Sequence, residues 1–367
     1  MITFWQQENG KLVKCEADTI DPNRKLWADA RSVTREDIRI LEEDYNIQKD
    51  HILDILDQDE LSRIEKDDDY VLIIMRLPVF EPANDISYFT IPLCIIFFES
   101  TIITICWTDC EVLKDIGANR LRNIRLNDFP AFTIQIMNRA DSTFLRYLKE
   151  INRRSATIQT EMQVSIKNTG LIHLLNLEKS LVFFTTSLKS NQLLLEKISK
   201  TRLISLDADD KDWLEDVEID NRQAIEMADT YSDILAGMTE AFSSVISNNM
   251  NIVMKRLTVI SLVMAVPTLI TSFFGMNVPL PFERKGWIGC IVITVFCLVA
   301  AIGAWFVIDG KNANDNKSNV PKIPAATTDD LFLENLFKES LKNVVGLVWN
   351  FCSCSLFALS TRVKSLS

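Results

Sequence analysis

The sequence predicts an α+β fold, in which an N-terminal domain of α/β/α layout is followed by long stalk helices and a hairpin of two transmembrane helices. Strand-like apolar runs alternate with helical patterns in residues 1–140, whereas residues 141–256 carry long helical patterns without strand signals. Two charge-free apolar stretches follow, at residues 257–275 and 286–308. With 367 residues, the chain is long enough for two or three domains.

The N-terminal domain contains short segments in which apolar and β-branched residues dominate. They predict strands at residues 26–28 and 70–80, and a hairpin formed by residues 86–99 and 101–107. Thr34 precedes Asp37 at the spacing of a capping box, which predicts that a helix begins there. Strands and helices therefore alternate in an α/β domain.

The stalk is predicted from a helical pattern that begins after an acidic run at residues 207–212. Its apolar residues fall on alternating steps of three and four: Val217, Ala224, Ala228, Tyr231, Leu235, Met238, Phe242, Val245 and Ile252. This spacing fits a coiled-coil-like seam, and it fits an ordinary helix packed in a bundle equally well. The pattern continues into the first apolar stretch, so one uninterrupted helix over residues 213–275 would be roughly 95 Å long.

The two apolar stretches are predicted to form a membrane hairpin. The loop between them, residues 276–285, is too short to hold a domain, so the segments that flank the hairpin share one side of the membrane. The N-terminus is polar and carries no signal peptide, which predicts that the large N-terminal domain stays in the cytoplasm. Residues 309–367 form an atypical C-terminal tail, with a polar linker followed by a further helical pattern.

Composition excludes several classes of function. Lys and Arg number 39 against 50 Asp and Glu, and the net charge of −11 argues against nucleic acid as a partner. The two His residues are too few for a His-based metal site or a Ser-His-Asp triad, and no Gly-rich phosphate loop is present. The eight Cys residues lack zinc-site spacing, which is typical of buried thiols in a reducing compartment. We therefore expect neither an enzyme nor an organic cofactor.

A stripe of small and polar residues runs along one helix face, from the end of the predicted stalk into the first apolar stretch. It consists of Asn251, Met254, Thr258, Ser261, Ala265, Thr268 and Ser272. Such a stripe avoids lipid. One explanation is tight helix packing, with hydroxyl groups bonded back to helix carbonyls. The other is a pore lining, which requires several copies of the chain because one hairpin cannot enclose a channel.

The residues that follow this helix carry a short motif. Gly275-Met276-Asn277 stands between the stalk-fused span and the second span, followed by Val278-Pro279-Leu280-Pro281. With this placement the sequence resembles the CorA family of divalent-cation transporters over residues 1–308. The resemblance implies a homopentameric magnesium channel in the inner membrane, whose partners are divalent cations, the lipid bilayer and other copies of the chain.

The chemistry of the motif suits a hydrated ion. Mg²⁺ sheds its octahedral water shell reluctantly, so a ring of Asn277 side-chain oxygens and Gly275 carbonyls would recognise it through neutral acceptors. On the residues alone, a Gly C-cap followed by Asn in a turn explains the motif as well. The resemblance implies that Gly275, Met276 and Asn277 form the selectivity filter.

The resemblance also assigns roles further along the chain. Asn251, Met254 and Leu257 match the inner pore and its hydrophobic constriction, and Thr268 matches a polar ring nearer the mouth. Asp54 and Asp216 match two carboxylates that the family brings together between neighbouring subunits to bind a regulatory Mg²⁺. The alternative for these two is ordinary surface charge.

Two other functions stay open on the sequence. One is transport of cobalt, nickel or zinc by the same fold. The other is a non-conducting, membrane-tethered coiled-coil scaffold.

The tail departs from the family, because residues 309–367 lack the basic cluster that usually follows the second span.

Overall fold

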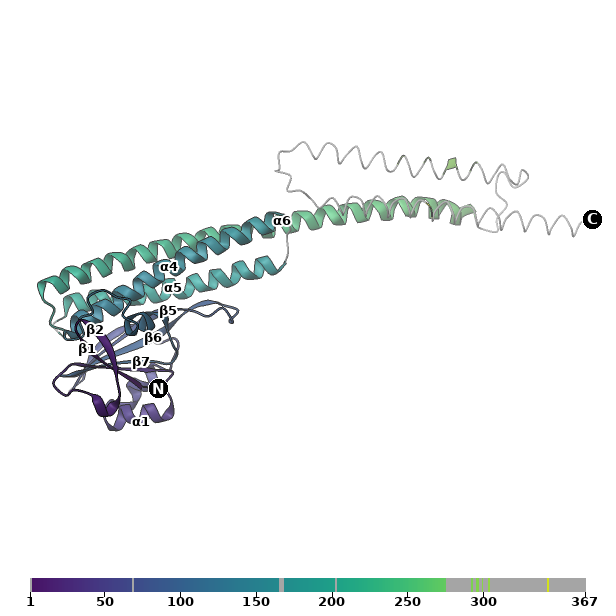
Figure 1. Ribbon diagram of the computed structural model, residues 1–367. Helices are drawn as coiled ribbons and strands as arrows, with labels where there is room; N and C mark the ends of the chain where they lie inside the picture. Colours follow the sequence, from purple (N-terminus) through teal and green to yellow (C-terminus); the bar gives the residue numbers. More distant parts are fainter. Residues whose placement is uncertain are drawn as a thin grey trace, which may run out of the picture. The chain divides into compact units, whose positions relative to one another are not determined.

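The computed structural model describes residues 2–67, 69–164, 168–201 and 203–274, together with isolated positions further on. The chain divides into two compact units, one formed by residues 1–162 and 167–241 and the other by residues 163–166 and 242–367. The first unit contains the β-sheet and the helices that pack on it (Figure 1).

The sheet has seven strands in the order β2-β1-β3-β7-β6-β5-β4. Their bounds are β1 Ile2–Glu8, β2 Lys11–Cys15, β3 Leu26–Arg31, β4 Arg63–Lys66, β5 Val71–Phe80, β6 Tyr88–Phe97 and β7 Thr101–Cys106. β3 and β7 run parallel at the centre, and every other neighbouring pair is antiparallel. The expected strands at residues 26–28 and 70–80 and the expected hairpin are confirmed. Phe98 and Thr101 close the turn of that hairpin with a 2.8 Å backbone hydrogen bond.

The helices flank the sheet and continue beyond it. They are α1 Arg35–Glu43, α2 Lys49–Asp54, α3 Glu111–Gly117, α4 Phe129–Val164, α5 Asn168–Lys200 and α6 Ala208–Phe274, and Ala17–Thr19 forms one 3-10 turn. The capping box is confirmed: Thr34 accepts from the Asp37 backbone, and Asp37 accepts in turn from the Thr34 backbone. The long helix expected over residues 213–275 is confirmed as far as Phe274 by α6, which begins earlier, at Ala208.

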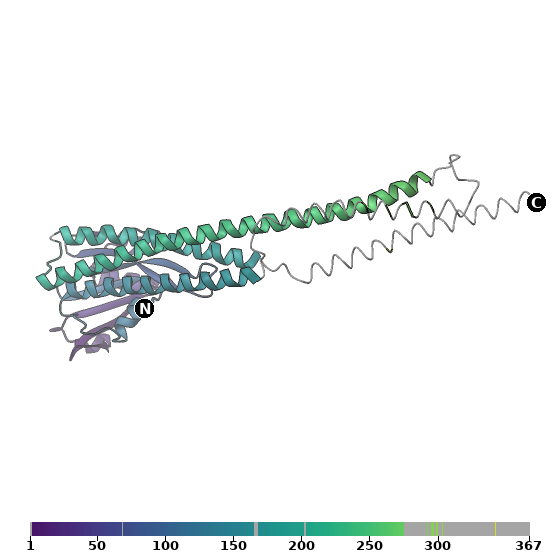
Figure 2. The same ribbon diagram turned by 90° about the horizontal axis from the view of Figure 1, so that it is seen from above.

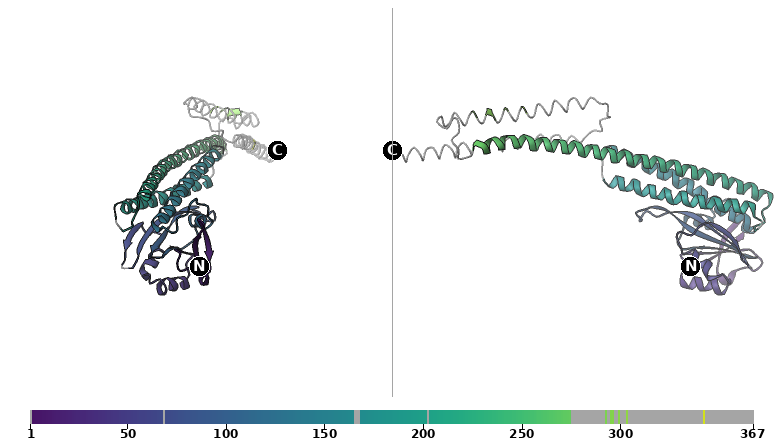
Figure 3. Two further views of the ribbon diagram at one scale, coloured as in Figure 1. Left: turned by 60° about the vertical axis from the view of Figure 1, so that its left-hand side comes forward. Right: turned by 180° about the vertical axis from the view of Figure 1, so that it is seen from behind.

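Alternate residues of the central strands face two separate hydrophobic cores, as the two-residue period of a strand requires. Ile73 and Met75 of β5 belong to the core shared with α3, α4, α5 and α6. Leu72 and Ile74 belong to the core shared with α1 and α2. The long helices and α1 therefore cover opposite faces of the sheet (Figure 3). This is the α/β/α layering that the sequence predicts.

The helix α5 is fastened to the sheet by side chains that pair with strand backbone. Asn191 Oδ1 accepts from the Arg76 amide at 2.8 Å, and Asn191 Nδ2 donates to the Arg76 carbonyl at 2.9 Å. Lys197 Nζ donates to the Ile64 carbonyl at 3.0 Å. Within the first unit, α4, α5 and the part of α6 up to residue 241 lie side by side (Figure 2). The hydrogen bonds of Asn191 and Lys197 satisfy polar groups that burial would otherwise leave unpaired.

Candidate functional site

The predicted stripe lies on α6, within the second unit. Its residues and the adjoining Leu257 are all exposed in the single chain: Asn251, Met254, Leu257, Thr258, Ser261, Ala265, Thr268 and Ser272. Because an α-helix has 3.6 residues per turn, steps of three and four keep them on one face. The face that the sequence singled out is therefore helical and accessible in the isolated chain.

Three hydroxyl groups of the stripe bond back to the helix that carries them, as the helix-packing explanation expects. Thr258 Oγ1 donates to the Met254 carbonyl at 2.8 Å, Ser261 Oγ donates to the Leu257 carbonyl at 3.0 Å, and Thr268 Oγ1 donates to the Met264 carbonyl at 2.8 Å. A hydroxyl has one proton and two lone pairs. With the proton used, the oxygens of Thr258 and Ser261 act on their surroundings as acceptors, which suits the protons of water bound to a cation.

The predicted filter follows the last residue of α6, which is Phe274. Gly275, Met276 and Asn277 lie outside the described residues, as do most of the predicted second span at residues 286–308 and of the tail at residues 309–367. Among the described residues, no helix is both long enough and apolar enough to cross a membrane.

Asp54 is the last residue of α2 and is half-buried. The guanidinium of Arg63 donates to its Oδ2 at 2.7 Å. Exposed leucines surround it in the sequence, at Leu53, Leu56 and Leu61. Large exposed apolar side chains that gather on a surface are typical of a region that another protein chain covers.

Asp216 lies in the third turn of α6 and is exposed. It is next to the buried Val217 and about one turn before Ile219, which is 54% exposed. Val217 packs in the core under α3–α6, whereas α2 packs on the other face of the sheet. Asp54 and Asp216 therefore belong to helices on opposite faces of the sheet, and a single chain does not bring them together.

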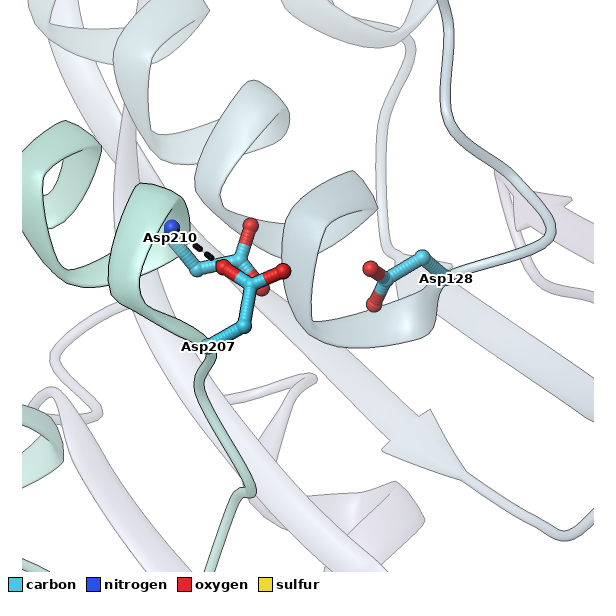
Figure 4. Close-up of side chains that lie close together, drawn as sticks. All are labelled: Asp128, Asp207 and Asp210. Carbon is cyan, nitrogen blue, oxygen red and sulfur yellow. Dashed lines mark hydrogen bonds between the residues drawn. The ribbon is translucent and has the colours of Figure 1, made fainter.

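A third acidic group, which the sequence did not single out, joins the starts of α4 and α6. One carboxylate oxygen each of Asp128, Asp207 and Asp210 lies within 4.8 Å of the others (Figure 4). Asp128 caps α4 by accepting from the Ala131 amide, and Asp207 caps α6 by accepting from the Asp210 amide. The run Asp207-Ala208-Asp209-Asp210 before a helical pattern could have signalled the second cap.

Arg125 balances part of this charge. Its guanidinium lies 3.0 Å from Asp128 and 3.1 Å from Asp210. Burial raises the pKa of Asp210, and the charges of Asp128 and Asp207 raise it further. Two helix caps and a shared arginine account for the position of all three carboxylates, so this cluster is structural.

Comparisons with known proteins agree with the resemblance drawn from the motif. A cobalt/magnesium transport protein CorA from Methanocaldococcus jannaschii is 26% identical over 317 residues, covering 81% of this chain and 97% of that protein. One from Thermotoga maritima is 20% identical over 290 residues, covering 77% and 82%.

Solved structures share the fold. The complete structure of the CorA magnesium transporter from Methanocaldococcus jannaschii superposes with a TM-score of 0.68 at 24% identity, covering 84% of this chain and 96% of that one. The family described as CorA-like Mg²⁺ transporter protein matches residues 23–311. Its members are transporters and not enzymes, and this chain belongs to that family.

Proposed function

We propose that the chain forms a CorA-type magnesium channel, in which several copies of α6 surround a pore and the polar stripe lines it. The family match over residues 23–311 is the observation that carries this proposal. The exposed stripe supports it, because small, hydroxyl and amide side chains predominate on it, with Met254 as the one large apolar member. One helix cannot enclose a pore, so the function requires a homo-oligomer, and the family resemblance implies a pentamer.

The membrane-spanning region in this proposal is the hairpin of residues 257–275 and 286–308, with the sheet domain in the cytoplasm and the channel in the inner membrane. Residues 1–140 form the cytoplasmic domain and residues 141–256 the stalk. The Gly-Met-Asn motif begins at Gly275, the end of the first span, and continues into the outer loop at residues 276–285. Its acceptors bind Mg²⁺ with the water shell in place, because that ion dehydrates reluctantly.

The pore narrows at its inner end in this proposal. Asn251 and Met254 line the inner pore, and Leu257 adds an apolar ring that excludes water when the channel is closed. Thr258, Ser261, Ala265, Thr268 and Ser272 continue the lining toward the filter.

Asp54 and Asp216 form a regulatory Mg²⁺ site between neighbouring subunits. Their helices lie on opposite faces of the sheet, which favours ligands from two chains over ligands from one. The exposed leucines around Asp54 and the exposed Ile219 near Asp216 supply apolar contact for such an interface. Carboxylate oxygens are the ligands that Mg²⁺ prefers. Without the ion, two like charges face each other across the interface and loosen the assembly.

Cobalt is the second candidate ion, because both curated relatives carry names that pair cobalt with magnesium. Flux into proteoliposomes tests both candidates. We expect Mg²⁺ uptake that a hexaammine cation, which imitates hydrated Mg²⁺, inhibits. Co²⁺ uptake without Mg²⁺ uptake would show that cobalt is the transported ion. If the liposomes take up neither ion, the proposed transport function is wrong.

A further inference from the structure

The guanidinium of Arg63 is surrounded by three carboxylates. Arg63 is the first residue of β4 and contacts Asp54 at 2.7 Å and Glu65 at 2.8 Å, and it also forms an ion pair with Glu60. The Arg63 side chain is 24% exposed, so the group is partly shielded from water. Three carboxylates thus share a single positive charge. The carboxylate of Asp54 is the one that belongs to the proposed regulatory site.

We propose that Arg63 is a tethered competitor of the regulatory divalent ion and sets the Mg²⁺ concentration at which the Asp54–Asp216 site fills. This inference rests on the proposed function. The physical reason is that the guanidinium already neutralises Asp54, so an arriving Mg²⁺ meets both a partly compensated carboxylate and a nearby positive charge. The compensated carboxylate and the nearby positive charge each make the free energy of Mg²⁺ binding less favourable.

The arrangement also explains how Arg63 releases Asp54 without becoming an unpaired charge. Glu60 and Glu65 remain as partners when the ion takes the Asp54 carboxylate, so the guanidinium keeps two of its three ion pairs. Conversely, when the ion leaves, Arg63 returns to Asp54 and limits the repulsion that the free carboxylate exerts on the neighbouring subunit. Arg63 is therefore a positioning residue that adjusts the affinity of the site without binding the ion.

Partial exposure limits the size of the effect. The side chains of Asp54 and Glu65 are 40% and 44% exposed, and ion pairs of this kind are screened by solvent and salt. A change on the order of tenfold in the midpoint of a Mg²⁺ titration is expected on removal of the guanidinium charge, since about 1.4 kcal/mol corresponds to a factor of ten.

Limited proteolysis of the full chain in detergent, titrated with Mg²⁺, measures this midpoint without reference to transport. In Arg63→Gln we expect protection at about tenfold lower Mg²⁺ than in wild type. Arg63→Lys keeps the positive charge and should shift the midpoint less than Arg63→Gln. The matched control is Arg39→Gln on α1, where an exposed arginine pairs with Glu36 and Glu43. That control removes the same charge away from Asp54 and should leave the midpoint in place.

The outcomes separate this inference from the proposed function. If Asp54→Asn abolishes protection but Arg63→Gln leaves the midpoint unchanged or raises it, Arg63 has no competing role while the ion site stands. If Asp54→Asn leaves protection intact, the ion site itself is wrong. Should Arg63→Gln fail to assemble, Glu65→Gln provides the second test, because it removes one rival partner and turns Arg63 toward Asp54. The midpoint should then rise several-fold, and an unchanged or lower midpoint would contradict the inference.

Discussion

Asn221 of α6 and Asp141 of α4 form a buried polar pair, in which Asn221 Nδ2 donates to Asp141 Oδ1 at 3.2 Å. Asn221 is fully buried and Asp141 is 2% exposed. Asn221 Oδ1 finds no hydrogen-bond partner among the described residues. Burial raises the pKa of Asp141 to about 8, the Asn221 hydrogen bond opposes this rise, and the charge of Asp220 adds to it. A neutral Asp141 carboxyl can supply the proton that Asn221 Oδ1 lacks.

The stability of the folded chain should fall as the pH rises from about 4 to about 8. In this window the folded state holds a proton on Asp141, whereas the unfolded state, with an ordinary pKa of 3.8, has lost it. Stability rises with pH only where the unfolded state binds more protons than the folded state does. Asp141 holds its proton in the folded state, so its contribution to the stability falls as the pH rises. The slope is on the order of 1.4 kcal/mol for each pH unit. Thermal unfolding of the full chain in detergent at pH 5, 6.5 and 8 measures it.

Asp141→Asn should remove this slope. The amide has nearly the same shape, cannot ionise, and offers both an acceptor for Asn221 Nδ2 and a donor for Asn221 Oδ1. We expect the variant to be more stable than wild type at pH 8 and to depend less on pH. Asp229→Asn is the control, since Asp229 lies on the surface of α6 and pairs with Lys189. A wild-type pH profile in Asp141→Asn would contradict the assignment.

Asn277→Ala should assemble but lose selective Mg²⁺ uptake, because the side-chain amide supplies the acceptors for the hydrated ion in the proposed filter. Ion flux into proteoliposomes and size-exclusion chromatography measure the two properties separately. Asn312→Ala, in the predicted linker beyond the second span, makes the same chemical change and should transport normally. Unchanged Mg²⁺ flux in Asn277→Ala would exclude the filter assignment.

Leu257→Gly should raise the leak of Mg²⁺ through the closed channel, because an apolar ring blocks ions by excluding water. Glycine also weakens a helix interior by about 1 kcal/mol relative to alanine. Leu269→Gly on the same helix carries that helix effect without touching the stripe, so it should not leak. Efflux from Mg²⁺-loaded liposomes compares the two variants, and equal leaks would locate the gate elsewhere.

Thr258→Val should lower the Mg²⁺ flux while preserving the helix. Valine keeps the shape of threonine but lacks its hydroxyl oxygen. In Thr258 that hydroxyl donates its hydrogen bond to the Met254 carbonyl, so the oxygen offers only acceptor lone pairs to the pore. Thr230 of α6 makes the same bond, donating to the Glu226 carbonyl at 2.7 Å. Thr230→Val in the predicted stalk is therefore the matched control. If both variants conduct as wild type does, the hydroxyls serve only in helix packing.

The sequence predicted those elements whose pattern is local. β5, β6 and β7 are predominantly apolar runs, and the three- and four-residue spacing along α6 placed its stripe on one face. The β1–β2 hairpin was missed, although Asn9-Gly10 is a strong two-residue turn signal and both residues adopt positive φ, 48° and 77°. β4 was also missed, because four residues of which three are charged give no apolar alternation.

Contacts between distant positions were beyond the reach of sequence reasoning. Asp141 and Asn221 are 80 residues apart, and neither residue type signals a buried pair on a helix. Arg63 of β4 reaches Asp54 at the end of α2 across the loop between them, and no spacing rule encodes this contact. The proposed meeting of Asp54 and Asp216 depends on a second chain, so neither one sequence nor one folded chain contains it.

Asp54 and Asp216 should make the resistance of the stalk to proteolysis depend on Mg²⁺. In wild type, roughly millimolar Mg²⁺ should protect the stalk from proteolysis, because an ion that binds the closed assembly stabilises it by mass action. Changing Asp54 and Asp216 together to Asn should remove both the protection and the repulsion that loss of the ion exposes. The channel should then respond less to internal Mg²⁺ and keep its Asn277-dependent selectivity.

A matched double variant separates this site from general charge effects. Asp50→Asn with Glu226→Gln changes exposed acids on the same two helices, α2 and α6, and removes the same net charge. It should retain the wild-type protection curve. Residual sensitivity in the Asp54/Asp216 variant is compatible with the proposal, since Glu215, Glu218 and Asp220 lie nearby on α6. A double variant whose protection matches wild type over the whole titration would contradict the proposal. Asp54 and Asp216 would then be ordinary surface charges.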